Sequence, residues 1–268
     1  MRNKQIIKLV LSALFITLSF VLTRFFVLPP GPTLFRFTLG SVPIIIASLI
    51  LGPIYGGLVG IGADVIGALL FPTGTFLVFP VISSMLYGVL PYFFMRLIRL
   101  LRLSKSVPII SSFGVILYSL LLVFVWTSSE TKSIITKETI IFDTTFRVWF
   151  TVISAVVLIL IVTALFLVNK YMGQRNKGKI TFVYEIALAI SFTDIIVDII
   201  YTSSWKTLYW DLPFFLVVAM HIIIFITLLP LKTLFVNLII YAFEKSGISL
   251  LSPIFVYKDK EADQATEE

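Results

Sequence analysis

The sequence predicts an all-α fold, a polytopic bundle of transmembrane helices without a separate soluble domain. Three observations predict it. The 268 residues are 59% hydrophobic and 13% charged, with a mean hydropathy of +1.06, whereas soluble domains are only about half apolar. Apolar runs long enough to cross about 30 Å of hydrocarbon recur from end to end. Basic residues gather in clusters between these runs, as they do in cytoplasmic loops.

The apolar runs predict eight spans. The first begins like a signal peptide, but it lacks a small-residue cleavage site and continues through Arg24, so we interpret it as a retained span. The next spans follow from turn residues and charges that interrupt the apolar pattern. The predicted spans are 6–28, 34–51, 53–71, 76–96, 107–127, 146–169, 181–204 and 213–243.

The basic clusters fix the predicted orientation. They lie at the N-terminus, after span four and after span six, which places all three on one side of the membrane. That side is expected to be the cytoplasm, with both termini there. We expect one transmembrane domain over 1–258 and a disordered acidic tail over 259–268. The cluster residues are Arg2, Lys4, Lys8, Arg96, Arg99, Arg102, Lys105, Lys170, Arg175, Lys177 and Lys179.

We single out five ionisable residues inside spans, where a charge is costly and usually faces protein or an aqueous path. At about 1.5 Å of rise per residue, all five lie in the outer half of the membrane. This shared depth predicts one outward-facing pocket, although each residue could instead form a hydrogen bond that only fixes helix packing. The residues are Arg24, Asp64, Asp194, Asp198 and His221.

Helical spacing predicts which way two of the spans face. Gly56, Gly60, Asp64 and Ala68 recur every four residues, so Asp64 continues a stripe of small residues that packs against protein. On span seven, one helix face carries two acids, two aromatic residues and a hydroxyl, a set that suits a flat, hydrogen-bonding ligand. That face consists of Asp194, Asp198, Tyr201, Thr202 and Trp205. Trp205 also fits an interfacial aromatic belt.

The sequence argues against catalysis. It has no cysteine, and we find no phosphate-binding P-loop, no His-Glu-x-x-His helix and no serine elbow. One histidine and scattered aspartates do not make a metal site, so neither a metal nor a cofactor is expected. The net charge of +7 follows the loop asymmetry, so no nucleic-acid partner is expected.

Residues 10–100 resemble the substrate-binding S components of energy-coupling factor (ECF) vitamin transporters, most closely the folate-type subgroup. The similar motifs are Thr23-Arg24-Phe25, Gly40 to Pro43, Gly52 to Gly57, Ala63-Asp64 and Gly67 to Pro72. "SSMLYG", residues 83–88, resembles the family's fourth helix. The resemblance implies a vitamin-binding subunit of an ABC importer that works with a transmembrane coupling protein and two cytoplasmic ATPases.

The resemblance also implies residue roles. Asp64 would hold the polar ring edge of a folate-like vitamin, with Phe71 and Tyr201 stacking on the ring. Arg24, Arg36 and Lys206 would attract an anionic tail. Ala13 and Thr17 correspond to the small-residue motif that contacts the coupling protein. All these residues carry their numbers in this sequence.

The second half departs from the family pattern. An Asn pair and a Trp of the family align with Asp194, Asp198 and Tyr201, and an Arg aligns with His221. The new acids make a cationic vitamin such as thiamine a competing ligand. The family has six helices, so the core is expected at 6–100 and 180–245, with an inserted hairpin at 107–169. A cation-coupled secondary carrier and a purely structural membrane protein remain alternatives.

Overall fold

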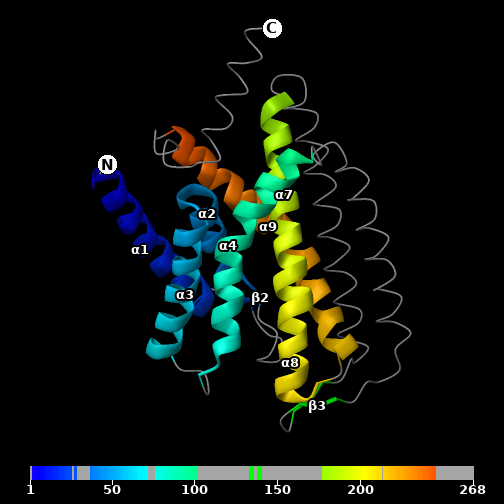
Figure 1. Ribbon diagram of the computed structural model, residues 1–268. Coiled ribbons are helices and arrows are strands. Elements are labelled where there is room, and N and C mark those ends of the chain that lie inside the picture. Colours follow the sequence, from blue (N-terminus) through cyan, green and yellow to red (C-terminus); the bar gives the residue numbers. More distant parts are fainter. Residues whose placement is uncertain are drawn as a thin grey trace.

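The computed structural model describes residues 2–25, 27–28, 37–71, 76–101, 133–135, 138–140, 177–212 and 214–245. Within these ranges the chain is a bundle of helices with two short antiparallel sheets (Figure 1). Four helical segments in the described ranges are long and apolar enough to cross a membrane: Gln5–Arg24, Pro53–Leu70, Val78–Leu100 and Val217–Phe243. The predicted all-helical membrane class is confirmed.

The helices of the first half are α1 (Arg2–Arg24), α2 (Ser41–Leu51), α3 (Pro53–Leu70) and α4 (Val78–Leu100). The second half contains α7 (Lys177–Asp194), the π-helix η2 (Ile195–Thr202), α8 (Ser203–Trp210) and α9 (Phe214–Lys245). Strands β1 (Val27–Leu28) and β2 (Phe37–Thr38) pair with each other, as do β3 (Ser133–Ile135) and β4 (Glu138–Ile140).

The first two predicted spans have wrong boundaries. The first helix ends at Arg24, not at residue 28, and the second begins at Ser41, not at residue 34. Between them, Val27 pairs with Thr38 and Leu28 with Phe37. Leu28 precedes Pro29, and a residue before proline is disfavoured in the helical conformation. The strand pair therefore replaces helix that hydropathy alone predicted.

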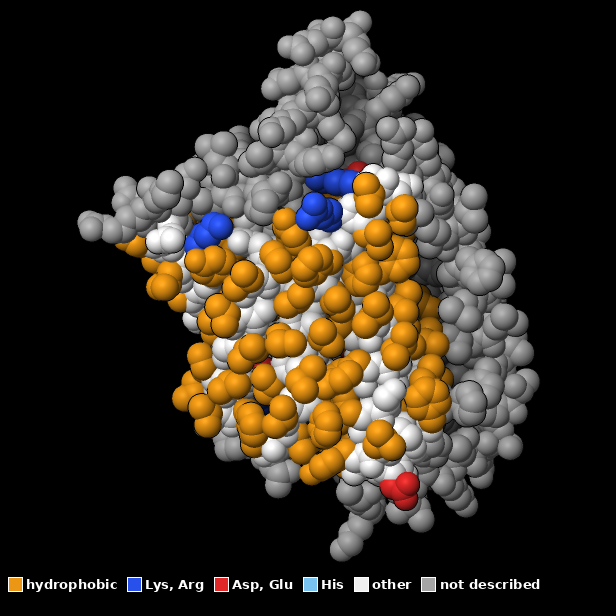
Figure 2. All heavy atoms as spheres, viewed as in Figure 1, with side chains coloured by type: hydrophobic (Ala, Val, Ile, Leu, Met, Phe, Trp, Pro, Cys, Tyr) orange, Lys and Arg blue, Asp and Glu red, His pale blue; other side chains and the backbone are white. Residues whose placement is uncertain are grey.

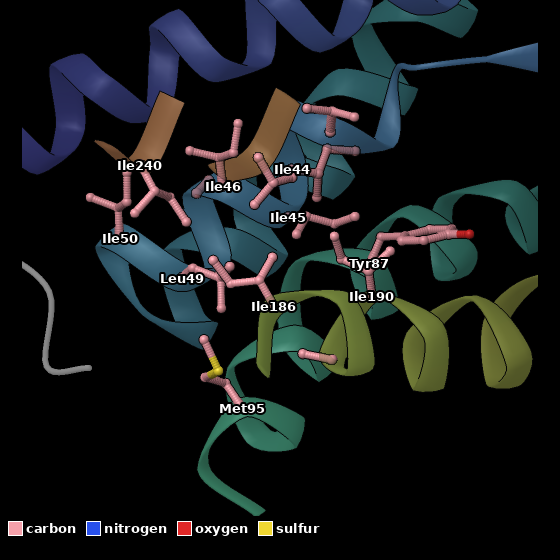
Figure 3. Packing of buried hydrophobic residues seen from close by; sticks show 14 of the residues in the cluster. Ile44, Ile45, Ile46, Leu49, Ile50, Tyr87, Met95, Ile186, Ile190 and Ile240 are labelled. Atoms are coloured by element: carbon pink, nitrogen blue, oxygen red, sulfur yellow. The ribbon is translucent and has the colours of Figure 1, made fainter. Parts of the chain in front are cut away.

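The short helix α2 forms the centre of the bundle. Its 11 residues span about 16 Å at 1.5 Å per residue, only half of the hydrocarbon thickness. Every residue from Val42 to Leu51 is buried, which is the pattern of a helix enclosed on all sides. Figure 3 shows its isoleucines facing Ile186 and Ile190 of α7 and Ile240 of α9.

Helices α3 and α4 pack through small residues. A Cβ on Gly56 would collide with the carbonyl oxygen of Gly88, and a Cβ on Gly60 with that of Ser84. Such close backbone approach is what small residues permit between membrane helices. The predicted stripe on span three therefore does pack against protein, and it continues to Asp64 and Ala68, which line the cavity described below.

Several basic side chains lie at one border of an apolar face. Figure 1 places the start of α1, the end of α4 and the start of α7 toward the same side of the bundle. Figure 2 shows Lys and Arg side chains along the upper border of a broad hydrophobic face and an acidic group at its lower border. This pattern fits a protein surrounded by lipid.

Most of the predicted inserted hairpin at 107–169 lies outside the described residues. The exceptions are β3 and β4, where Ser133 pairs with Ile140 and Ile135 with Glu138. Both strands fall in the loop predicted between the two inserted spans. The predicted acidic tail at 259–268 also lies outside the described residues.

Candidate ligand pocket

A cavity of about 680 Å³ opens between the two halves of the chain. Its volume lies in the range of about 300–1,000 Å³ found for small-molecule sites. Its walls come from α1, α2, α3 and α4 on one side and from η2, α8 and α9 on the other. The titratable lining residues among those described are Arg24, Asp64, Tyr87, Asp198, Lys206, Tyr209, His221 and Lys232.

Asp64 and Arg24 line the same wall of this cavity. Arg24 is the last residue of α1, and its side chain lies across Gly67 of α3, one turn after Asp64. A Cβ on Gly67 would lie 3.1 Å from both Nε and Nη2 of Arg24. Gly67 therefore leaves the space that the guanidinium occupies. The end of α1 is held in turn by Ser19, whose hydroxyl donates to the carbonyl oxygen of Gly40 at 2.7 Å.

A charged cluster closes another part of the cavity. Lys232 Nζ of α9 lies 2.9 Å from Asp194 Oδ1 and 4.0 Å from Asp198 Oδ2. The hydroxyl of Tyr87 on α4 lies 2.8 Å from Asp194 Oδ1 and 2.6 Å from Asp198 Oδ2. Tyr87, Asp198 and Lys232 line the cavity, whereas Asp194 is fully buried behind them.

His221 belongs to a hydrogen-bond chain that links α9 to α8. Its Nδ1 lies 2.8 Å from the carbonyl oxygen of Val217 and 3.1 Å from Ser203 Oγ. Its Nε2 lies 3.2 Å from Lys206 Nζ. A carbonyl oxygen only accepts and an ammonium only donates, so the geometry assigns the hydrogen to Nδ1 and leaves Nε2 as the acceptor. His221 thereby orients Lys206, which lines the cavity beside it.

An aromatic group covers a further part of the wall. Trp205 stacks on Phe79 with ring centroids 5.5 Å apart and an angle of 9° between the planes, and it contacts Trp210 at 5.3 Å. Trp205 is 7% exposed, so it is a cavity residue and not part of an interfacial belt. Its Nε1 is buried, and the described residues supply no hydrogen-bond partner for this donor.

The predicted single face of span seven does not hold throughout. Residues 195–202 form a π-helix, in which the hydroxyl of Thr202 donates to the carbonyl oxygen of Val197, five residues earlier, at 2.7 Å. The wider turn changes the register that an α-helix would give. Asp198, Thr202 and Trp205 line the cavity, but Tyr201 does not, and its hydroxyl donates to the carbonyl oxygen of Phe79 at 3.4 Å.

Two other predicted residues lie away from this cavity or outside the described ranges. Phe71 is 46% exposed and packs on Phe20 and Phe25, with ring centroids 5.7 and 5.6 Å apart. It contacts these two rings and is not part of the cavity lining. Arg36 lies outside the described residues. Phe20, which contacts Phe71, does line the cavity.

Ala13 and Thr17, the predicted contact with a coupling protein, both lie on the exposed side of α1. The hydroxyl of Thr17 donates to the carbonyl oxygen of Ala13 at 3.0 Å. The hydroxyl is therefore satisfied within the helix, and the pair presents a small, flat surface.

Sequence reasoning missed two residues of the charged cluster, Lys232 and Tyr87. Lys232 lies well inside the predicted span 213–243, so the rule that singled out the other ionisable residues applies to it as well. Tyr87 lies in the family-like segment 83–88, but a tyrosine in an apolar helix carries no signal until its partners are known. Among the described residues, no group of three His, Cys, Asp or Glu side chains could hold a metal ion.

Comparison with known proteins gives two matches. Residues 7–136, just under half of the chain, match the family "ECF transporter, substrate-specific component". The folate transporter FolT of Clostridium novyi (strain NT) is 30% identical over 114 residues, which cover 40% of this chain and 63% of that relative. The chain thus matches less than two thirds of the relative's length. No solved structure matches the chain.

Proposed function

We propose that the chain is a substrate-specific component of an ECF transporter, the family whose model matches residues 7–136, and that it binds a folate-like vitamin at the outer face of the membrane. It then delivers the vitamin through a transmembrane coupling protein and two cytoplasmic ATPases, which other chains supply. The observation that carries this proposal is the cavity of about 680 Å³, with Asp64 and Arg24 on one wall.

Asp64 is the proposed anchor of the vitamin ring. A carboxylate accepts two parallel N–H bonds from an exocyclic amino group and the adjacent ring nitrogen, and such charged hydrogen bonds are about twice as strong as neutral ones. Arg24 and Lys206 line the same cavity and would attract the carboxylates of the glutamate tail. Trp205 lines the cavity and offers a ring face, and its N–H donor has no partner among the described residues. The similarity to a folate transporter supports the same ligand.

The charge of the cavity favours folate over thiamine. Among the described lining residues, Arg24, Lys206 and Lys232 are basic and only Asp64 and Asp198 are acidic. Asp194, one of the two acids for which the sequence predicts a cationic vitamin as a competing ligand, is buried against Lys232. A cation would therefore enter a site without excess negative charge, whereas an anionic tail finds basic side chains.

The fold supports a family-like arrangement in the membrane. We propose a six-helix core over 6–100 and 180–245, an inserted helical hairpin over 107–169, and a cytoplasmic location of both termini. The grouping of basic side chains at one border supports this orientation. Ala13 and Thr17 on α1 are the proposed contact with the coupling protein.

A cation-coupled secondary carrier is the second candidate, because the buried cluster of Lys232, Asp194 and Asp198 has the composition of a proton or ion relay. The two functions differ in one measurement. A carrier accumulates substrate in proteoliposomes that contain this chain alone, driven by an ion gradient. The proposed subunit requires the coupling protein, the ATPases and ATP.

Calorimetry on the detergent-solubilised protein tests the proposed function, with folate, riboflavin and thiamine as ligands. Folate is expected to bind most tightly. Asp64→Asn should weaken it by about 10- to 100-fold, the effect of losing a hydrogen-bonded charge. Asp211→Asn is the matched control, because Asp211 is exposed at the end of α8. Tight thiamine binding without folate binding would exclude the folate assignment but keep the family role.

A further inference from the structure

Two acids lie one turn apart on the helix that lines the cavity. Asp194 is the last residue of α7 and Asp198 lies in η2. Without counter-charges, this pair would give the cavity the negative potential that a cationic ligand prefers. The compensation comes from a distant part of the chain. Lys232 of α9 reaches both carboxylates, and its side chain is only 3% exposed.

Tyr87 fixes the orientation of the pair. Its hydroxyl lies within hydrogen-bond distance of Asp194 Oδ1 and Asp198 Oδ2. Asp198 therefore turns Oδ2 toward Tyr87 and Lys232, while Oδ1 has no hydrogen-bond partner among the described residues. The side chain of Asp198 is 21% exposed and lines the cavity. Asp198 Oδ1 is thus available as an acceptor for a ligand.

From this arrangement we propose that Lys232 is a specificity-determining residue for the vitamin site. Lys232 offsets one of the two negative charges of the acid pair, and together with Arg24 and Lys206 it leaves the site without excess negative charge. Asp198 then accepts an N–H bond from a neutral or anionic ligand, and the cavity as a whole does not attract a cation. Tyr87 is the positioning residue that aims Asp198. This inference rests on the proposed function and adds to it the charge class of the ligand.

The charge balance explains why one side chain has this effect. Counting Asp194 behind the wall, three basic residues (Arg24, Lys206, Lys232) balance three acidic ones (Asp64, Asp194, Asp198). Removing Lys232 leaves an excess negative charge in a buried, weakly screened site, where charges interact strongly. Removing the charge of Asp194 leaves an excess positive charge. The two substitutions should therefore shift ligand preference in opposite directions.

The experiment compares Lys232→Met, Asp194→Asn and the double variant by calorimetry with folate, riboflavin and thiamine. Lys232→Met should weaken folate binding at least about tenfold and make thiamine binding measurable, because it removes one unit of favourable charge. Asp194→Asn should raise the ratio of folate affinity to thiamine affinity. The double variant, which restores the balance, should return the ratio to within about threefold of the original, as expected for coupled sites.

If Lys232 serves only the stability of the fold, a different result is expected. In that case the double variant loses as much folate affinity as Lys232→Met, and the ratio of folate affinity to thiamine affinity does not change. That outcome overturns the inference while folate binding by the original protein keeps the proposed function. If Lys232→Met does not fold, the ratio in Asp194→Asn decides: an unchanged or reversed ratio contradicts the inference.

A second ion pair provides the matched control. Arg99 Nε lies 2.9 Å from Glu185 Oε2 and joins α4 to α7, whereas Lys232 and Asp194 join α9 to α7. Neither Arg99 nor Glu185 lines the cavity. The double variant Arg99→Met with Glu185→Gln should leave the ligand ratio unchanged. If the original protein binds none of the three vitamins, the proposed function and this inference both fail.

Discussion

Lys232 Nζ lies 2.9 Å from Asp194 Oδ1, and both side chains are almost completely buried in the middle of the bundle. Removing one partner leaves an uncompensated charge, which in buried pairs costs about 3–5 kcal/mol, whereas replacing both by apolar groups is often neutral. We expect Asp194→Ala to lower the thermal stability of the ligand-free protein strongly. Asp194→Leu combined with Lys232→Leu should lose much less. Equal losses in both variants would show that the pair does not act as a unit.

The contact between α3 and α4 depends on Gly56. Because a Cβ at this position collides with the carbonyl oxygen of Gly88, Gly56→Val should force the helices apart at a cost of about 1–3 kcal/mol or more. The measurement is thermal unfolding followed by size-exclusion chromatography in detergent. Leu58→Val, at a side chain that is 58% exposed, is the control and should change little. A stable Gly56→Val protein would contradict the packing.

The aromatic ring of Trp205 and its N–H donor can be tested separately by substitution. Trp205→Phe keeps an aromatic ring on Phe79 and removes the buried Nε1, which has no partner among the described residues. If this N–H bonds the vitamin, folate affinity should fall about 3- to 10-fold, the value of one neutral hydrogen bond. Calorimetry measures it. Tyr201→Phe, outside the cavity lining, should leave affinity unchanged. If Trp205→Phe binds folate with unaltered affinity, the N–H does not bond the vitamin and only the ring contributes to binding.

Substitution at the exposed pair Ala13 and Thr17 of α1 can distinguish an effect on vitamin binding from an effect on transport. Ala13→Leu enlarges the surface proposed to meet the coupling protein, so vitamin uptake by cells that also express the coupling protein and ATPases should fall at least about tenfold. Vitamin binding by the isolated protein should not change. Leu18→Phe, an equally enlarged position about 100° around the helix from Thr17, should retain uptake. Loss of uptake in both variants would argue against a specific contact.

Much of the fold follows from hydropathy and charge. Spans near 53–71, 76–96 and 213–243 were placed close to α3, α4 and α9, because long apolar runs have few other structures available to them in lipid. A break between the first two spans was predicted as well. The end of α1 at Arg24 and the start of α2 at Ser41 were not, since the neighbouring residues are as apolar as a helix interior. Pairing between Val27 and Thr38 depends on residues that are distant in sequence.

The candidate site was predictable in part. Arg24, Asp64, Asp198, Trp205 and His221 line one cavity, and the cost of placing polar groups in a membrane had singled out most of them. Tyr201 and Phe71 lie elsewhere. The π-helix at 195–202 changes the register of Tyr201, and a periodicity argument assumes an unbroken α-helix.

The sequence by itself determined that this is a multi-pass helical membrane protein with costly charges retained in its spans, and its motifs carry the resemblance to the S components. Only the tertiary structure decided which charges meet. Asp194 contacts Tyr87, 107 residues before it, and Lys232, 38 residues after it. Helical spacing states which residues share a face of one helix, but the partner of a buried charge lies on another helix. Packing therefore turned an apparently acidic wall into a neutral one.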